Sequence, residues 1–164
     1  MSKTLVFDIE TDGLLLDVTC MWVGVTYCIE TKEEKIFYDA REMVDYLNEA
    51  SCVVGHNIIG YDIPALYKLS GIEVNSRAID TLTLAKLAYY DKDRSWSHSL
   101  DAYGERLGEP KGNYNDWSKY TKEMEEYCKQ DVQVTKKLYQ HLKRKTTWLP
   151  ETALQLEQDV QKIV

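Results

Sequence analysis

The sequence has little of what marks membrane, disulfide-rich or disordered proteins. Its longest apolar stretches, such as residues 21–25, are far shorter than the roughly 20 residues that cross a bilayer. Glycine and proline are scarce, at 8 and 3 of 164 residues, which argues against a fibrous or low-complexity chain. The four cysteines show no Cys-x-x-Cys spacing of the kind found in zinc and redox sites. We therefore expect a globular protein with reduced, structural thiols.

The size and the amino terminus favour one cytoplasmic domain without a membrane partner. At 164 residues and 44% hydrophobic content, the chain is long enough to bury a core of its own. Its first residues, MSKTLVFD, run directly into a predicted strand and do not have the pattern of a secretory signal.

Hydrophobic periodicity predicts an α/β domain. Runs rich in β-branched and aromatic residues predict strands over residues 3–9, 20–30, 35–38, 52–55 and 78–81. Apolar residues at helical spacing predict helices over residues 40–50, 61–69, 82–90 and 122–145. A three-strand meander followed by alternating strands and helices indicates a mixed five-stranded sheet flanked by helices. We favour an RNase H-like fold, although periodicity alone leaves other α/β arrangements open.

The carboxyl-terminal segment has a separate pattern. Residues 1–149 are expected to form the domain, and residues 150–164 a helical tail that follows Pro150. The apolar residues of this tail are Leu154, Leu156, Val160 and Ile163. The tail either packs back on the domain or begins a further segment.

Two acidic residues stand near the end of the first predicted strand. Because side chains alternate along a strand, Asp8 and Glu10 point to the same side. Paired carboxylates repel each other unless a proton or cation intervenes. Their hard oxygen atoms, with no neighbouring His or Cys, favour Mg²⁺ or Mn²⁺ over zinc. Such a pair taken alone is common at solvated strand ends.

Further acidic candidates lie later in the chain. Tyr127 and Asp131 are four residues apart and share one face of the long predicted helix. Taken separately, they fit a core aromatic and a surface carboxylate better than a functional site. Asp62, in HNIIGYD, also fits an acid in the first turn of a helix, where it complements the dipole.

In combination these residues resemble the three motifs of the DEDD exonuclease superfamily. The tyrosine matches the DEDDy branch, because the position where the other branch has a histidine is Glu126 here. Longer strings extend the likeness to the exonuclease domain of podovirus-type family A phage DNA polymerases, over nearly all of residues 5–142. These strings are FDIETDGLL, GHNIIGYDIPAL, IDTLTLAKL, SHSLDAYGERLGEPKGNY and EEYCKQDVQVTKKLY.

The resemblance implies a site with two divalent metal ions, Mg²⁺ or Mn²⁺, that clamp the scissile phosphate. Asp8 would bridge both ions, Glu10 and Asp131 would hold the first, and Asp62 would reach the second. Tyr127 would orient the attacking water.

The resemblance also implies contacts to the last nucleotide from Thr11, Leu14 and Asn57. Thr11 and Leu14 fit a strand-end cap and an ordinary core residue nearly as well. The spacing from Asn57 to the second-motif aspartate is one residue longer than in cellular relatives. His56 and His98 are expected to be structural, because a lone histidine in such contexts is more often a satisfied polar group.

The implied function is 3′→5′ hydrolysis at single-stranded DNA 3′ ends with release of 5′-mononucleotides, in proofreading for a phage DNA polymerase in the host cytoplasm. A DNA polymerase chain or domain is the expected protein partner. Two alternatives stay open: trimming of RNA 3′ ends, and a non-catalytic docking domain. A binding-only domain has no physical need for clustered carboxylates.

The charge balance at first opposes a nucleic-acid partner, since phosphate-binding proteins usually have a basic surface. Two divalent cations in the carboxylate cluster would change the net charge from −7 to about −3. The basic residues are also unevenly distributed, with five near one end: Lys136, Lys137, Lys143, Arg144 and Lys145.

Overall fold

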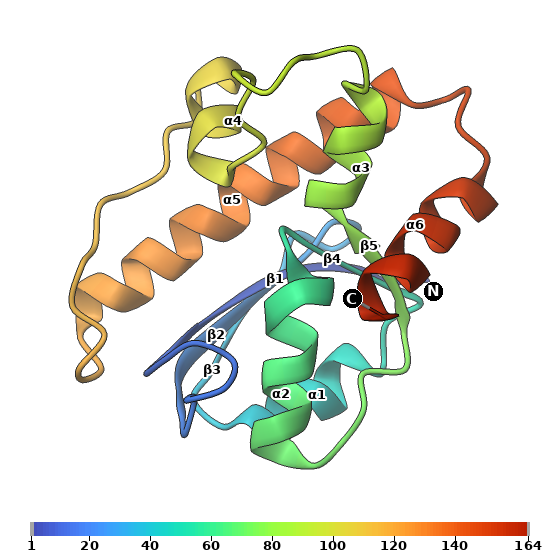
Figure 1. Ribbon diagram of the computed structural model, residues 1–164. Coiled ribbons are helices and arrows are strands. Elements are labelled where there is room, and N and C mark those ends of the chain that lie inside the picture. Colours follow the sequence, from blue (N-terminus) through green and yellow to red (C-terminus); the bar gives the residue numbers. More distant parts are fainter. Residues whose placement is uncertain (1, 164) are drawn as a thin grey trace.

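A five-stranded mixed sheet forms the centre of the structure, a computed structural model that describes residues 2–163 (Figure 1). Its strands are β1 (Thr4–Thr11), β2 (Met21–Cys28), β3 (Glu34–Phe37), β4 (Cys52–Gly55) and β5 (Arg77–Asp80). They lie in the order β3-β2-β1-β4-β5. The first three pair antiparallel, whereas β1, β4 and β5 pair parallel. The expected mixed five-stranded sheet is confirmed.

Helices cover both faces of this sheet (Figure 1). They are α1 (Ala40–Leu47), α2 (Ile63–Ser70), α3 (Thr81–Ala88), α4 (Leu100–Leu107), α5 (Lys122–Lys145) and α6 (Glu151–Ile163). One core lies between the sheet and α1 with α2, and the other between the sheet and α3, α4 and α5. No helix of residues 2–163 has the length and apolar character needed to cross a membrane.

The alternation of side chains along β1 decides where its carboxylates point. Leu5 and Phe7 are buried in the core beneath α1 and α2, whereas Val6 is buried in the core beneath α5. Asp8 and Glu10 therefore lie on the α5 face. The expectation that both carboxylates share one side of the strand agrees with this alternation.

The observed elements differ from the expected ones mainly before α2. The helix expected over residues 61–69 begins at Ile63, and a π-helical turn, η1 (Ile58–Asp62), precedes it. Pro64 is the second helical residue, a position where its missing N–H costs nothing. Asp62 is thus the last residue of η1 and not part of the first turn of an α-helix.

The tail helix α6 packs against α3 and η1. Leu154 enters the core beneath α5, and Gln158 is only 1% exposed. The Gln158 amide accepts the N–H of Asp80 at 2.8 Å and donates to the carbonyl of Ala78 at 2.9 Å. It therefore covers the edge of β5, which would otherwise present unpaired backbone groups. Leu156, Val160 and Ile163 of the tail remain exposed.

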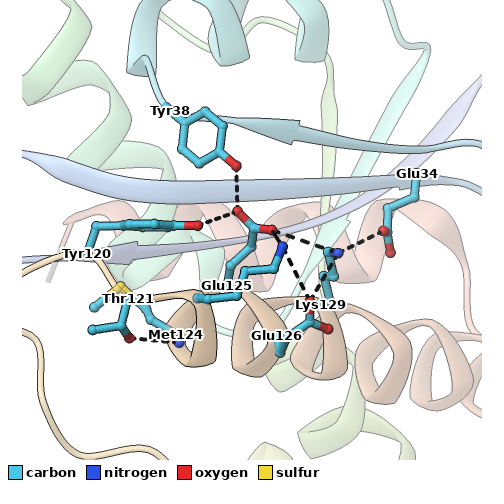
Figure 2. Close-up of polar contacts among 9 residues, drawn as sticks. Glu34, Tyr38, Tyr120, Thr121, Met124, Glu125, Glu126 and Lys129 are labelled. Atoms are coloured by element: carbon cyan, nitrogen blue, oxygen red, sulfur yellow. Dashed lines mark hydrogen bonds and ion pairs between the residues drawn. The ribbon is translucent and has the colours of Figure 1, made fainter.

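A buried carboxylate fixes the first turn of α5 (Figure 2). Glu125 is 1% exposed and accepts hydrogen bonds from the hydroxyls of Tyr38 at 2.5 Å and Tyr120 at 2.8 Å. The ammonium groups of Lys122 and Lys129 lie 2.5 and 3.9 Å from its other oxygen. Burial opposes the charge, but the bonds from Lys122, Tyr38 and Tyr120 lower the pKa of Glu125 to about 2.

We predict that this cluster makes stability depend on pH in acid. The pKa of Glu125 is lowered from 4.5 to about 2 on folding, so its contribution is present above pH 4.5 and is lost as the pH falls toward 2. Glu125→Gln should lower the free energy of unfolding at pH 7 by about 1–3 kcal/mol, nearer the lower value because Lys122 is mostly exposed.

Urea unfolding of both proteins at several pH values measures this difference, which should shrink toward zero near pH 2. Glu126→Gln is the matched control, because Glu126 is 58% exposed on the same helix. A difference of equal size at pH 7 and pH 2 would contradict the assigned pKa.

Candidate active site

The carboxylates of Asp8 and Glu10 extend from β1 toward α5. On the neighbouring strand, Asp8 pairs with Val25 and Glu10 with Val23. The register then shifts between Glu10 and Thr11, an irregularity that changes the direction of the side chains that follow. Glu10 is 7% exposed, whereas Asp8 is half-buried.

Asp62 reaches the same strand from η1. Its carboxylate accepts the backbone N–H of Ile9 at 3.3 Å, beyond the end of the β1–β4 pairing. A second buried carboxylate, Asp80, accepts the N–H groups of Asn57 at 2.8 Å and Ile59 at 3.0 Å. Asp80 therefore holds the start of η1, and the turn places Asp62 beside β1.

Asp131 approaches from α5. One of its oxygens lies 3.5 Å from the ammonium of Lys111. Its other oxygen, Oδ1, is buried and has no hydrogen-bond partner within the described residues. A buried carboxylate oxygen without a partner is costly, and a cation is the kind of ligand that would satisfy it.

The pKa values show that these carboxylates act on one another. Burial raises the pKa of Asp8 well above its usual range, and Asp131, Glu10 and Asp62 each raise it further. Burial followed by the charge of Glu10 raises the pKa of Asp131 to about 7, against the opposing effect of Lys111. The pKa of Asp62 is raised by burial and by Glu10. The four predicted ligands thus lie near enough for their charges to interact, and the group of candidate ligand atoms within 4.8 Å of one another consists of Asp8, Glu10 and Cys128.

Tyr127 lies one turn before Asp131 and is half-buried. The Lys111 ammonium stands 5.0 Å from its ring centre, and the rings of Tyr114 and Trp117 pack against it at 5.9 and 6.4 Å. Its position beside the carboxylates suits the predicted role of orienting water, and the aromatic contacts also make it part of a packed cluster.

The residue after Tyr127 is a cysteine that contacts Asp8. The sulfur of Cys128 lies 3.5 Å from both Asp8 Oδ2 and the Asp8 carbonyl oxygen, and it lies close enough to Asp8 and Glu10 to complete a group of candidate metal ligands. Burial raises the pKa of the Cys128 thiol well above 9.0. The protonated thiol is a donor to Asp8 and not a ligand, because metals bind the thiolate.

A cavity of about 360 Å³ opens beside the carboxylates. Its walls include Glu10, Thr11, Leu14, Tyr61 and Trp117. The Thr11 hydroxyl is hydrogen-bonded to the Gly13 carbonyl at 3.0 Å and to Tyr61 at 2.5 Å. Leu14 is 77% exposed, so the core-residue interpretation of Leu14 is wrong.

Asn57 stands apart from this cavity. It begins η1 with a left-handed backbone conformation, φ 62°, is exposed, and does not belong to the cavity lining. A role for Asn57 on the terminal nucleotide therefore stays a prediction.

The two histidines that were expected to be structural, His56 and His98, both form hydrogen bonds within the domain. The ring nitrogens of His56 lie 2.8 Å from the Thr81 hydroxyl and 2.9 Å from the His98 carbonyl. Burial lowers the pKa of His56 to about 4. His98 Nδ1 lies 2.7 Å from the Tyr103 hydroxyl. These contacts tie β4, α3 and α4 together.

Sequence reasoning missed two residues of the loop before α5, Lys111 and Trp117. The indole N–H of Trp117 donates to Glu10 Oε2 at 2.7 Å, and Lys111 is the cation that faces Asp131. Lys111 lies in SHSLDAYGERLGEPKGNY, a string that carries the resemblance but gave this lysine no role, and Trp117 lies outside every such string, with its partner 107 residues away in sequence. No local pattern could have indicated either contact.

Comparison with known proteins gives both a sequence relative and a fold. No protein-family model matches the chain. The chain is 33% identical in sequence to the DNA-directed DNA polymerase of Escherichia phage T7. The match covers 84% of this chain and 26% of the polymerase. The chain thus spans about a quarter of the length of the curated relatives that it matches.

Solved structures that match the fold at low sequence identity include a family B DNA polymerase and Exonuclease I. Brucella melitensis NrnC with bound Mg²⁺ superimposes with a TM-score of 0.74 at 16% identity, covering 99% of this chain and 87% of NrnC. Escherichia coli Exonuclease I in complex with a dT13 oligonucleotide gives 0.64 at 13% identity, covering 91% and 42%. The chain therefore has an RNase H-like fold and is related in sequence to about a quarter of the phage T7 DNA polymerase.

Proposed function

We propose that this domain is a metal-dependent 3′→5′ exonuclease that hydrolyses phosphodiester bonds at DNA 3′ ends and releases 5′-mononucleotides. The observation that carries the proposal is the convergence of four carboxylates with an unpartnered buried oxygen on Asp131. The relationship to a DNA polymerase and the fold shared with Exonuclease I in its complex with dT13 support DNA as the substrate. Proofreading for a phage polymerase is the role we infer.

The donor set fits divalent metal ions. Asp8, Glu10, Asp62 and Asp131 provide only carboxylate oxygens, the ligands that Mg²⁺ and Mn²⁺ prefer. Their raised pKa values reflect burial and mutual repulsion, which cations would relieve. When bound, two such ions would polarise the phosphate and lower the pKa of the attacking water.

The remaining tasks fall to side chains around the carboxylates. Trp117, Thr11 and Leu14 line the adjacent cavity, which we assign to the terminal nucleotide. The Tyr127 hydroxyl is the group that we assign to orienting the attacking water, since Tyr127 is half-buried beside the cluster. Lys111 lies against both Tyr127 and Asp131, so its positive charge is available to an entering phosphate.

The chain should shorten 5′-labelled single-stranded DNA one nucleotide at a time in Mg²⁺ or Mn²⁺, and should not do so in EDTA. Denaturing gels and chromatography of the released nucleotides measure direction and product. Asp131→Asn should abolish cleavage, because the variant loses a ligand while the helix is kept. Glu126→Gln changes an exposed carboxylate of the same helix and should cleave normally. Cleavage from the 5′ end, or none with either metal, would refute the proposal.

Tyr127→Phe should lower the single-turnover rate by roughly 10²–10⁴-fold, the usual contribution of a group that orients or transfers a proton. DNA affinity, measured separately in Ca²⁺, should change little because the ring is kept. Tyr114→Phe is the matched control, since it removes a hydroxyl from a ring that packs against Tyr127. If Tyr127→Phe kept a rate within about twofold of wild type, Tyr127 would be only a packing residue.

Trp117→Phe should weaken the binding of Mg²⁺ about 10–100-fold, the typical loss when a group that orients a metal ligand is removed. The ring would stay in the aromatic cluster, while the bond to Glu10 would be lost. Metal titrations of the cleavage rate measure the effect, and saturating Mg²⁺ should restore the rate.

Trp22→Phe is the control for Trp117→Phe. It removes an indole N–H that donates to the Trp117 carbonyl at 2.9 Å and touches no carboxylate. Equal metal affinities for Trp117→Phe and the wild type would show that the hydrogen bond to Glu10 does not contribute to metal binding.

A further inference from the structure

A second cleft lies at the carboxyl-terminal end of α5. It has a volume of about 400 Å³ and is lined by Ala88, Tyr90, Asp91, Lys145 and Trp148. Tyr90 is 77% exposed and Trp148 is 59% exposed, although large aromatic side chains are usually well buried. The Trp148 indole is fixed by its N–H bond to the Lys145 carbonyl at 3.0 Å. Two exposed rings thus flank one opening.

The same end of the domain carries exposed cations, of which Lys145 lines this cleft together with Asp91, whereas Lys143 lines a separate cleft beside Tyr139. Lys143, Arg144 and Lys145 are exposed, and none has a carboxylate within ion-pair distance among residues 2–163. The Lys145 ammonium stands 4.8 Å from the centre of the Tyr89 ring, on the neighbouring helix. In a chain of net charge −7, this end forms a local site for anions.

Helix stability alone explains only part of this arrangement. Cations in the last turn of a helix are favoured by the helix dipole, which accounts for Lys143, Arg144 and Lys145 as such. It does not account for Tyr90 and Trp148, whose exposed rings are contributed by the segments after α3 and after α5. Aromatic faces beside unpaired cations are the combination that binds unstacked bases and the phosphates between them.

We propose that this cleft is a second binding site for single-stranded DNA, in which Tyr90 and Trp148 stack on bases, and Lys145 of the lining and its exposed neighbour Arg144 contact phosphates. The choice of DNA as ligand rests on the proposed function. Asp131 and Lys145 are 14 positions apart on α5, so the cleft lies about 21 Å along the helix from the carboxylates. That distance corresponds to about six nucleotides at the 3.4 Å spacing of a stacked strand. The cleft would therefore hold the strand upstream of the 3′ end.

DNA affinity is measured separately from cleavage, by fluorescence anisotropy in Ca²⁺. The probe is an oligothymidine of about 15 nucleotides, close to the longest stretch of strand that a single small domain binds. Tyr90→Ala and Trp148→Ala should each weaken affinity about 5-fold to 100-fold, the loss expected for one stacked base. The double variant Arg144→Gln and Lys145→Gln should reduce the slope of log affinity against log salt by up to about 1.4, at about 0.7 for each lost phosphate contact.

A matched control comes from the cleft between α2 and α6, which has a volume of about 640 Å³ and contains Tyr67 and Lys162. Tyr67 is 51% exposed, so Tyr67→Ala and Lys162→Gln remove the same types of group elsewhere. These variants should leave both affinity and salt slope unchanged. Thermal melting checks that every variant is folded.

The length of the substrate separates this inference from the proposed function. Cleavage of a trinucleotide, which is too short to reach the cleft, should proceed normally in Tyr90→Ala and Trp148→Ala, while cleavage of the long strand at low concentration should slow. Absence of all cleavage would refute the proposed function and leave the binding result standing. Unchanged affinity and salt slope in the cleft variants would overturn the second site, whatever the chain cleaves.

Discussion

Repulsion among buried carboxylates is the constraint on which the rest of the domain depends. Asp8 and Glu10 come from β1, Asp62 from η1 and Asp131 from α5, and burial with mutual repulsion raises the pKa of Asp8 well above its usual range. Such a cluster lowers the stability of the metal-free fold. It persists because three segments are held in place by contacts outside the cluster, so that the carboxylates cannot relax away from one another.

Two of these segments, η1 and α5, are anchored by a buried polar side chain that is itself hydrogen-bonded. Asp80 is 0% exposed and holds the start of η1, and Glu125 is 1% exposed and fixes the first turn of α5. Gln158 is also 1% exposed and pairs with the backbone of β5, from which Asp80 extends. Buried polar groups that are fully hydrogen-bonded make a structure rigid, because breaking any one bond leaves a buried polar atom unpaired and lowers the stability. The precision of the site thus comes from polar contacts that lie beyond it.

The sequence was most informative where a pattern is local and repeated. The long helix begins and ends where its apolar periodicity predicts, at Lys122 and Lys145, and the sheet has the expected strands. The π-helical turn before α2 was not foreseen, because the bonds from Asn57 and Ile59 to Asp80 cross more than 20 residues. Lys111 and Trp117 were missed for the same reason. The resemblance predicted the set of carboxylates, whereas the contacts that support them could be read only from the fold.

The distribution of charges along α5 explains how a protein of acidic composition can bind an anionic ligand. Asp131 stands in the middle of this helix and exposed cations stand at its end, so in the proposed complex one rigid element presents opposite charges to different parts of a strand. A net charge of −7 repels phosphates from most of the surface, and a local basic region is then the favoured place of first contact. The same repulsion discourages binding at other faces. An acidic protein can in this way select where a nucleic acid approaches, with the metal ions completing the attraction only at the carboxylates.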